Sequence, residues 1–142
     1  MSASLPANRS IPESVVIPVL SYADVGVAVE WLTRALGFVE RLRIGAHRAQ
    51  LSCGGGSIVV TDGATSSREG GNHSVMVRVA DIDSHFERAR ACGARVLAEP
   101  TDQPYGERQY SLLDPGGHAW TFTQTIADVD PRSWGGIPGP AM

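Results

Sequence analysis

Cysteine is scarce in this chain. Its two cysteines, Cys53 and Cys92, lie 39 residues apart, and neither belongs to a Cys-x-x-Cys pair. That spacing argues against a disulfide framework and against a cysteine zinc site. We therefore expect two reduced thiols, with Cys92 packed at the end of a helix.

Long apolar runs and an excess of one charge are also absent. The apolar runs have the length of strands, far short of a membrane span, and residues 1–8 lack the basic start and apolar stretch of a secretory signal. The chain carries 12 basic and 15 acidic residues, a net charge of −3. This charge balance does not indicate a protein that binds nucleic acid. We expect a cytoplasmic protein that binds neither a membrane nor a nucleic acid.

Two common catalytic motifs are missing as well. The sequence contains no Gly-x-Ser-x-Gly elbow and no Gly-x-x-x-x-Gly-Lys phosphate loop. A strand pattern, not a helix pattern, follows Gly54-Gly55-Gly56, so we interpret these glycines as a tight hairpin turn. Nucleophilic and phosphoryl-transfer chemistry therefore have little support.

What the chain does contain is a repeated pattern. Asp24 and Asp81 lie 57 residues apart, and Gly37 and Gly93 lie 56 apart, each aspartate preceding and each glycine ending a helical stretch. The 142 residues, 42% of them hydrophobic and 19% charged, suffice for one globular domain and are too few for two independent ones. Two half-sized units that share a core or a sheet are expected.

Each unit has the predicted order strand, helix, three strands. The expected divisions are a loose arm at 1–14, a single domain at 15–124 and a tail at 125–142, the domain consisting of module one (15–61), a linker (62–71) and module two (72–124). We expect a strand at 15–20, at a sheet edge because Pro18 lacks an N–H. Residues 99–106 are predicted to be a proline-punctuated loop, and the tail an extended strap anchored by Trp134.

Several strings together resemble the vicinal oxygen chelate superfamily, in its glyoxalase and bleomycin-resistance-like branch. They are Ala35-Leu36-Gly37-Phe38, Asp81-Ile82-Asp83, Ala91-Cys92-Gly93-Ala94, Pro104-Tyr105-Gly106-Glu107-Arg108 and Asp114-Pro115-Gly116-Gly117-His118-Ala119-Trp120. The resemblance implies an α+β fold in which two tandem βαβββ modules form curled mixed sheets around a cavity, with the helices outside. It also implies a homodimer.

Catalytic members of this superfamily hold a divalent metal with His, Gln or Glu at four positions, two in each module. Counting from the helix-capping aspartates and from the hairpin turns places these positions at Ile17, Val60, Ser74 and Thr121. Aliphatic side chains have no donor atom, and neutral hydroxyls alone bind a divalent ion poorly. His73 adjoins the third position, but a shift of one residue turns a strand side chain to the opposite face. We expect no metal and no cofactor.

Strand alternation predicts which side chains line the cavity. In the first unit the predicted inward set is apolar: Ile17, Val19, Ile58 and Val60. In the second unit it includes Ser74, Met76, Arg78, Ala119, Thr121 and Thr123, while Trp120 and Phe122 face the helices. His47, three residues at or beside the predicted loop and Trp134 of the tail are added to this set. The ligand-binding candidates are His47, Ser74, Met76, Arg78, Tyr105, Arg108, Tyr110, Thr121 and Trp134.

The sequence favours a metal-independent protein that binds a small, planar or amphipathic organic molecule, as in drug sequestration and antibiotic resistance. Tyr and Arg beside the cavity supply flat, stackable surface with a polar edge, unless Arg108 pairs with Asp102 or Glu107 instead. Two further hypotheses stay open: a glyoxalase-like lyase or isomerase with an atypical or absent metal site, and an interaction protein with a vestigial cavity. An enzyme would use His73 at its metal, or Arg78, His47 or Tyr110 without one.

Overall fold

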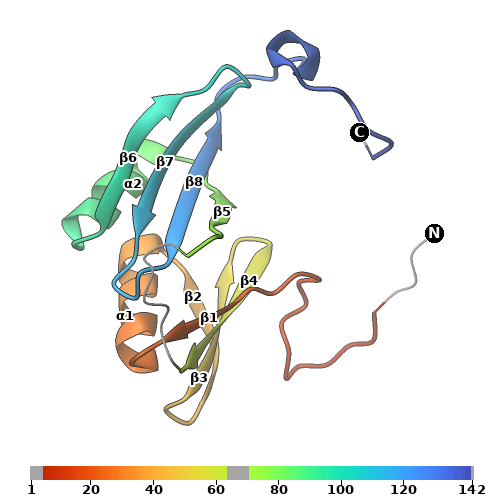
Figure 1. The fold of residues 1–142 in the computed structure, drawn as a ribbon. Coiled ribbons are helices and arrows are strands. Elements are labelled where there is room, and N and C mark those ends of the chain that lie inside the picture. Colours follow the sequence, from red (N-terminus) through yellow and green to blue (C-terminus); the bar gives the residue numbers. More distant parts are fainter. Residues whose placement is uncertain (1–4, 64–70, 142) are drawn as a thin grey trace. The chain divides into compact units, whose positions relative to one another are not determined.

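The computed structural model describes residues 5–63 and 71–141. The chain divides into two compact units, the first within Met1–Thr65 and the second within Ser66–Met142. Each unit has its own four-stranded sheet with one α-helix, in the order strand, helix, three strands (Figure 1). The predicted α+β fold with two βαβββ modules is therefore confirmed. Most of the predicted linker at 62–71 lies outside the described residues.

Unit 1 is a mixed sheet with strand order β1-β4-β3-β2. Strand β1 runs parallel to β4, whereas the other neighbouring strands are antiparallel. The elements are β1 Val19–Tyr22, α1 Val25–Leu36, β2 Val39–Ile44, β3 Arg48–Cys53 and β4 Gly56–Asp62.

Helix α1 begins and ends where the sequence predicts. The Asp24 carboxylate accepts a hydrogen bond from the Val27 N–H at 3.0 Å, and Gly37 ends the helix in the left-handed region at a φ of 77°. Val25, Val29 and Leu32 share one face and are buried. Their packing fixes the helix on one face of the unit 1 sheet.

The first strand starts later than predicted. The expected strand at 15–20 is observed at Val19–Tyr22, and Val15 and Val16 are 82% and 76% exposed. Pro18 has no N–H to give to a ladder, and pairing begins with its carbonyl, which accepts from the Val59 N–H at 2.9 Å. The position at the sheet edge agrees with the prediction.

Unit 2 repeats this topology with strand order β5-β8-β7-β6, and β5 is parallel to β8. The elements are β5 Val75–Arg78, α2 Ile82–Ala91, β6 Arg95–Asp102, β7 Glu107–Leu113, β8 Ala119–Thr125 and the 3-10 helix η1 Pro131–Trp134. The predicted loop at 99–106 is wrong over its first half, because β6 continues to Asp102. Pro100 is tolerated there since β6 is an edge strand and its register is irregular between Ala98 and Thr101.

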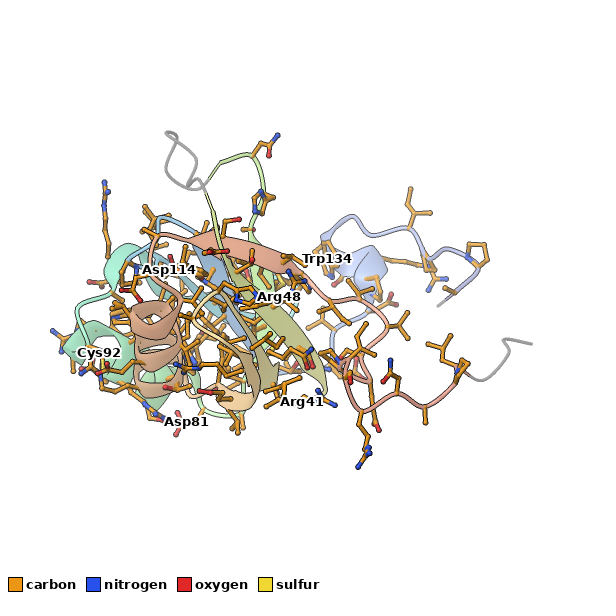
Figure 2. All side chains as sticks on the ribbon, turned by 90° about the horizontal axis from the view of Figure 1, so that it is seen from below. Arg41, Arg48, Asp81, Cys92, Asp114 and Trp134 are labelled. Atoms are coloured by element: carbon orange, nitrogen blue, oxygen red, sulfur yellow. The ribbon has the colours of Figure 1, made fainter. Side chains whose placement is uncertain are left out.

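The core of unit 2 is aromatic. Trp120 and Phe122 are fully buried on β8, as the alternation predicts, and Phe122 lies 4.2 Å from the His85 ring of α2, centroid to centroid. The Asp114 carboxylate joins this core to the β7–β8 turn, because it accepts from the Trp120 indole N–H at 3.0 Å and from two backbone N–H groups of the turn. Figure 2 labels Asp114 among the side chains.

The tail is more structured than the predicted extended strap. It crosses Gly106, whose carbonyl accepts from the Ile126 N–H at 2.9 Å, and then forms η1 with Trp134 as its last residue (Figure 2). Among the described residues, no helix has the length and apolar character needed to cross a bilayer.

Candidate functional site

A pocket opens on the face of the unit 2 sheet that lies opposite α2. Its volume is about 470 Å³, within the range of about 300–1,000 Å³ that small-molecule sites occupy. Three sheet strands, the loop before β7 and the tail contribute the lining residues Met76, Arg78, Tyr105, Glu107, Gln109, Thr123 and Trp134.

Two aromatic rings form one wall of the pocket. The Tyr105 and Trp134 rings lie 5.1 Å apart, centroid to centroid, at an interplanar angle of 53°. Trp134 remains 45% exposed, unlike the buried Trp31 and Trp120. A large aromatic surface that is held in place and only partly covered is well suited to stack against a flat ligand.

The floor of the pocket is a directed chain of hydrogen bonds. The Tyr105 hydroxyl donates to Gln109 Oε1 at 2.9 Å, and Gln109 Nε2 donates to Thr123 Oγ1 at 3.2 Å. The Thr123 hydroxyl then donates to Glu107 Oε1 at 2.6 Å. Each side chain therefore donates to the next one, and the series ends at the Glu107 carboxylate. These hydrogen bonds fix the rotamers of the side chains beneath the aromatic wall.

The pocket also holds one charge of each sign. Hydrogen bonds from Thr123 and Thr125, and then the nearby Arg78 guanidinium, hold the pKa of the Glu107 carboxyl below its usual value. Glu107 is therefore ionised at neutral pH. Arg78 Nη2 donates to Thr125 Oγ1 at 3.1 Å, which places a positive charge beside the carboxylate.

Four of the predicted ligand residues come together here: Met76, Arg78, Tyr105 and Trp134. Thr121 lies on the same face of the sheet, where it pairs with Met76 across the strands and its hydroxyl is 2.9 Å from that of Ser111. Ser74 is exposed and precedes β5. Sequence reasoning missed Glu107 and Gln109, although the alternation of polar residues along β7 contained the signal.

Tyr110 and Arg108 face the other side of the sheet. The Tyr110 hydroxyl is hydrogen-bonded to His85 Nδ1, its ring is 1% exposed, and burial raises the pKa of the phenol well above its usual value. Arg108 pairs with Asp102 at 2.6 Å and with Asp83 at 3.1 Å, so the ion pair with Asp102 that the sequence left open is present. Neither residue lines the pocket.

The remaining histidine candidates do not line this pocket. His47 is exposed in unit 1, in the turn that precedes β3. His73 is exposed and lies outside β5. Neither side chain lines the unit 2 pocket.

In unit 1 the inward set differs from the prediction at Ile58 and Val60. Both are buried on the face of β4 that pairs with Leu51 and Ala49. The cause is the hairpin: Cys53 pairs with Gly56 across a two-residue turn, whereas the matching turn of unit 2 is one residue longer, with the Asp114 N–H bonded to the His118 carbonyl.

Counting from the turn therefore overshoots by one residue in unit 1. Val19 pairs with Val59 as Met76 pairs with Thr121, so the residue equivalent to Thr121 is Val59 and not Val60. The chemistry of the position is unchanged, because valine also has no donor atom.

Comparison with known proteins agrees with this geometry. The sequence profile of the Glyoxalase/Bleomycin resistance protein/Dioxygenase superfamily matches residues 15–122. The chain belongs to this superfamily. The superfamily name covers several unlike activities, so membership alone does not define the function of this chain.

Individual relatives span most of the chain. TioX from Micromonospora sp. ML1 is 39% identical, with a TM-score of 0.67 over 80% of this chain and 99% of its own. The fosfomycin resistance protein FosX from Listeria monocytogenes is 16% identical, with a TM-score of 0.67 over 80% and 92% of the two chains, which supports the fold alone. Rv0887c from Mycobacterium tuberculosis is 28% identical over 83% of this chain and 78% of its own.

The four superfamily metal positions carry Ile17, Val59, Ser74 and Thr121 in this chain. None of these side chains is an imidazole or a carboxylate, so the donor set does not fit a divalent metal. Among residues 5–63 and 71–141, no three His, Cys, Asp or Glu side chains are grouped closely enough to hold a metal ion.

Proposed function

We propose that this protein binds a small, flat or amphipathic organic molecule in the unit 2 pocket without a metal, and that retention of the molecule is its function. The observation that carries the proposal is the aromatic wall of Tyr105 and Trp134 above an ordered polar floor. A flat ring stacks on the wall while its polar edge meets Arg78 and Glu107. Arg78 supplies hydrogen-bond donors to the ligand, and Glu107 supplies acceptors.

Two further observations support retention over turnover. The four metal positions lack side chains that could hold a metal ion, which is the group that would polarise a substrate. The ionised Glu107 has a lowered pKa and therefore makes a weak general base. Antibiotic sequestration is the biological role we propose for the pocket.

Ligand binding is tested with a panel of planar aromatic antibiotics and natural products. A ligand at one hundred times its Kd should add about 2.7 kcal/mol to the free energy of unfolding, measured as a thermal shift. It should also quench tryptophan fluorescence, since Trp134 is the half-exposed tryptophan. The Trp134→Ala variant should lose at least about tenfold in affinity, by the usual worth of a buried aromatic contact.

Ile137→Ala is the matched control, because Ile137 lies in the same tail, is 93% exposed and does not line the pocket. Its affinity for the same ligand should equal that of the wild type. Equal binding by Trp134→Ala and wild type would refute the pocket. A ligand that the protein converts to a product, followed by mass spectrometry, would favour an enzyme.

Metal independence has its own measurement. Elemental analysis of protein purified without a chelator should find far less than one zinc, nickel, iron or manganese per chain. Ligand affinity should be the same before and after dialysis against a chelator, because no side chain at the four positions is a good ligand for these ions. A stoichiometric metal, or loss of binding on its removal, would contradict the proposal.

A further inference from the structure

The N-terminal arm makes specific contacts with unit 1. Two of its successive backbone carbonyls accept hydrogen bonds from side chains of the sheet, Arg9 from Arg41 Nη2 at 2.8 Å and Ser10 from Gln50 Nε2 at 2.9 Å. Arg41 Nη1 also donates to Gln50 Oε1. The two donor side chains are thus hydrogen-bonded to each other under the arm.

The arm holds a defined conformation over this pair of donors. The Asn8 side chain accepts from the Ser10 N–H at 3.0 Å, and the Ile11 N–H donates to the Asn8 carbonyl at 3.3 Å, which forms a turn that leaves the Arg9 and Ser10 carbonyls to the sheet. Pro12 is buried just beyond the turn.

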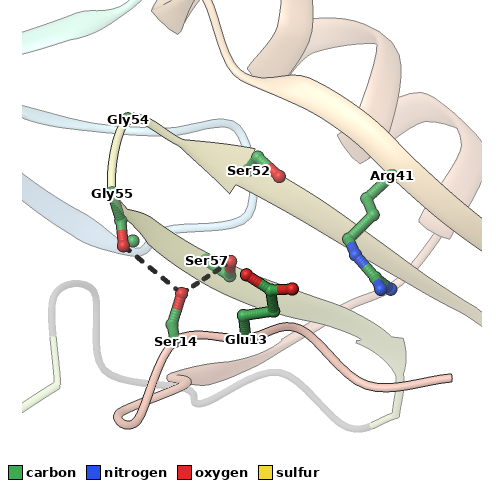
Figure 3. Close-up of a pocket in the computed structure, with 8 residues that line it drawn as sticks. Glu13, Ser14, Arg41, Ser52, Gly54, Gly55 and Ser57 are labelled. Atoms are coloured by element: carbon green, nitrogen blue, oxygen red, sulfur yellow. Dashed lines mark hydrogen bonds between the residues drawn. The ribbon is translucent and has the colours of Figure 1, made fainter. Parts of the chain in front are cut away.

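The far end of the arm is held at the β3–β4 hairpin. The hydroxyl of Ser14 lies 2.9 Å from that of Ser57, and Figure 3 shows the two side chains pointing toward each other. A polar pocket of about 480 Å³ lies beside this contact, bordered by the arm residues Glu13 and Ser14 and by Arg41. Space therefore remains next to the arm on the same surface.

The donor pair is a special feature of unit 1. Arg41 is the extra residue of a β-bulge between Glu40 and Leu42, and a bulge redirects a side chain that regular pairing would place elsewhere. Unit 2 has the same bulge between Val96 and Ala98, where Leu97 replaces the arginine.

The second donor is also specific to unit 1. Gln50 pairs with Val59 as Ser111 pairs with Thr121, so Ser111 is its counterpart in unit 2. Gln50 is only 5% exposed. A buried amide at this place needs partners for its donors and acceptor, and the Ser10 carbonyl and Arg41 supply them.

We propose that this surface of unit 1 is a binding site for a short peptide segment that presents two successive backbone carbonyls, and that residues 9–14 of the chain fill it. An external peptide of this kind gains access only by displacing the arm. Neither donor of this site lines the unit 2 pocket. Guanidinium and amide N–H groups recognise backbone carbonyls of any sequence, so the turn at Asn8 and the buried Pro12 supply the selectivity.

Displacement of the arm is measured on the full chain by trypsin cleavage after Arg9. The sequence contains no lysine, so an amine-reactive dye labels the N-terminal α-amino group and reports release of the fragment 1–9. Replacing the donors by their unit 2 counterparts, in Arg41→Leu/Gln50→Ser, should accelerate this cleavage by about tenfold or more, because cleavage follows the population of the undocked arm.

The matched control is Arg43→Leu on the same strand, since the Arg43 guanidinium is engaged by Glu40 through two hydrogen bonds. Its cleavage rate after Arg9 should equal that of the wild type. Equal rates for wild type and the Arg41→Leu/Gln50→Ser variant would overturn the proposal. A rate that depends on protein concentration would also overturn it, because the arm would then be docked on a second copy.

Binding of an external peptide is tested with a dye-labelled peptide of residues 5–14. It should bind, by fluorescence anisotropy, to a full-length variant in which residues 5–13 are replaced by glycine and serine at equal length. It should not bind the wild type, whose site is filled by its own arm. It should also not bind the glycine–serine variant that carries Arg41→Leu/Gln50→Ser, which lacks both donors. A scrambled peptide that binds equally well, or no binding to the folded variant, would refute the site.

Discussion

Asp114→Ala should lower the free energy of unfolding by about 3–5 kcal/mol, measured by urea denaturation. Asp114 is 5% exposed, and its Oδ1 accepts from the Gly116 and His118 N–H groups at 2.9 and 3.0 Å. Its Oδ2 accepts from the fully buried Trp120 indole at 3.0 Å. Alanine leaves that indole N–H without its carboxylate partner and removes two bonds that close the turn.

Two comparisons separate these contributions. Asp114→Asn should destabilise less, because its amide oxygen still accepts from the turn while its NH₂ meets the indole N–H. A double-mutant cycle with Trp120→Phe should give a coupling energy of about 1–2 kcal/mol. Pro115→Ala in the exposed part of the turn is the control, with a change within about 0.5 kcal/mol. A loss below about 1 kcal/mol for Asp114→Ala would show that the carboxylate does not hold the turn to the core.

Gly106→Ala should detach the tail and abolish ligand binding at the unit 2 pocket. A Cβ at Gly106 would lie 2.3 Å from the Ala127 carbonyl oxygen and 2.9 Å from Val129 Cγ2, and the residue has a φ of +84°. The tail must move to avoid that overlap, and with it moves Trp134. We expect a fall in stability of about 1–3 kcal/mol and a red shift of tryptophan emission.

Gly93→Ala isolates the steric part of this effect. Gly93 also has a φ of +84°, but a Cβ there meets nothing within 4 Å. Both substitutions carry the same backbone strain, and only Gly106→Ala forces the tail away. Gly93→Ala should therefore retain the wild-type emission and ligand affinity. Equal ligand affinity in the two variants would show that the Gly106 crossing does not position Trp134.

The repeat made most of the fold predictable. Capping aspartates, helix-ending glycines and period-two strands are local signals, and they predicted both helices and the order of the elements in each unit. Two of the errors occurred at prolines. Pro18 delayed β1, whereas Pro100 did not end β6, since an edge strand with irregular register tolerates a residue that cannot donate.

The site was less predictable because it depends on geometry between strands. Alternation and chain setting predicted Met76, Arg78, Tyr105 and Trp134 as ligand residues, and all four line one pocket. The side of the sheet that Tyr110 faces became clear only from its pairing with Phe122. In unit 1 a turn shorter by one residue shifted the count to Val60. Strand pairing joins segments that are distant in the chain, and a register error of one residue reverses every side chain that follows.

The matched bulges at Arg41 and Leu97 also explain how two copies of one module come to differ. A bulged residue has no partner of its own across the ladder, so its replacement leaves strand pairing intact. Each copy of the module thus has a position where a new binding side chain disturbs the sheet little. Exchanging Arg41 with Leu97 and Gln50 with Ser111 would remove both donors from unit 1 and place the same side chains at the matching positions of unit 2.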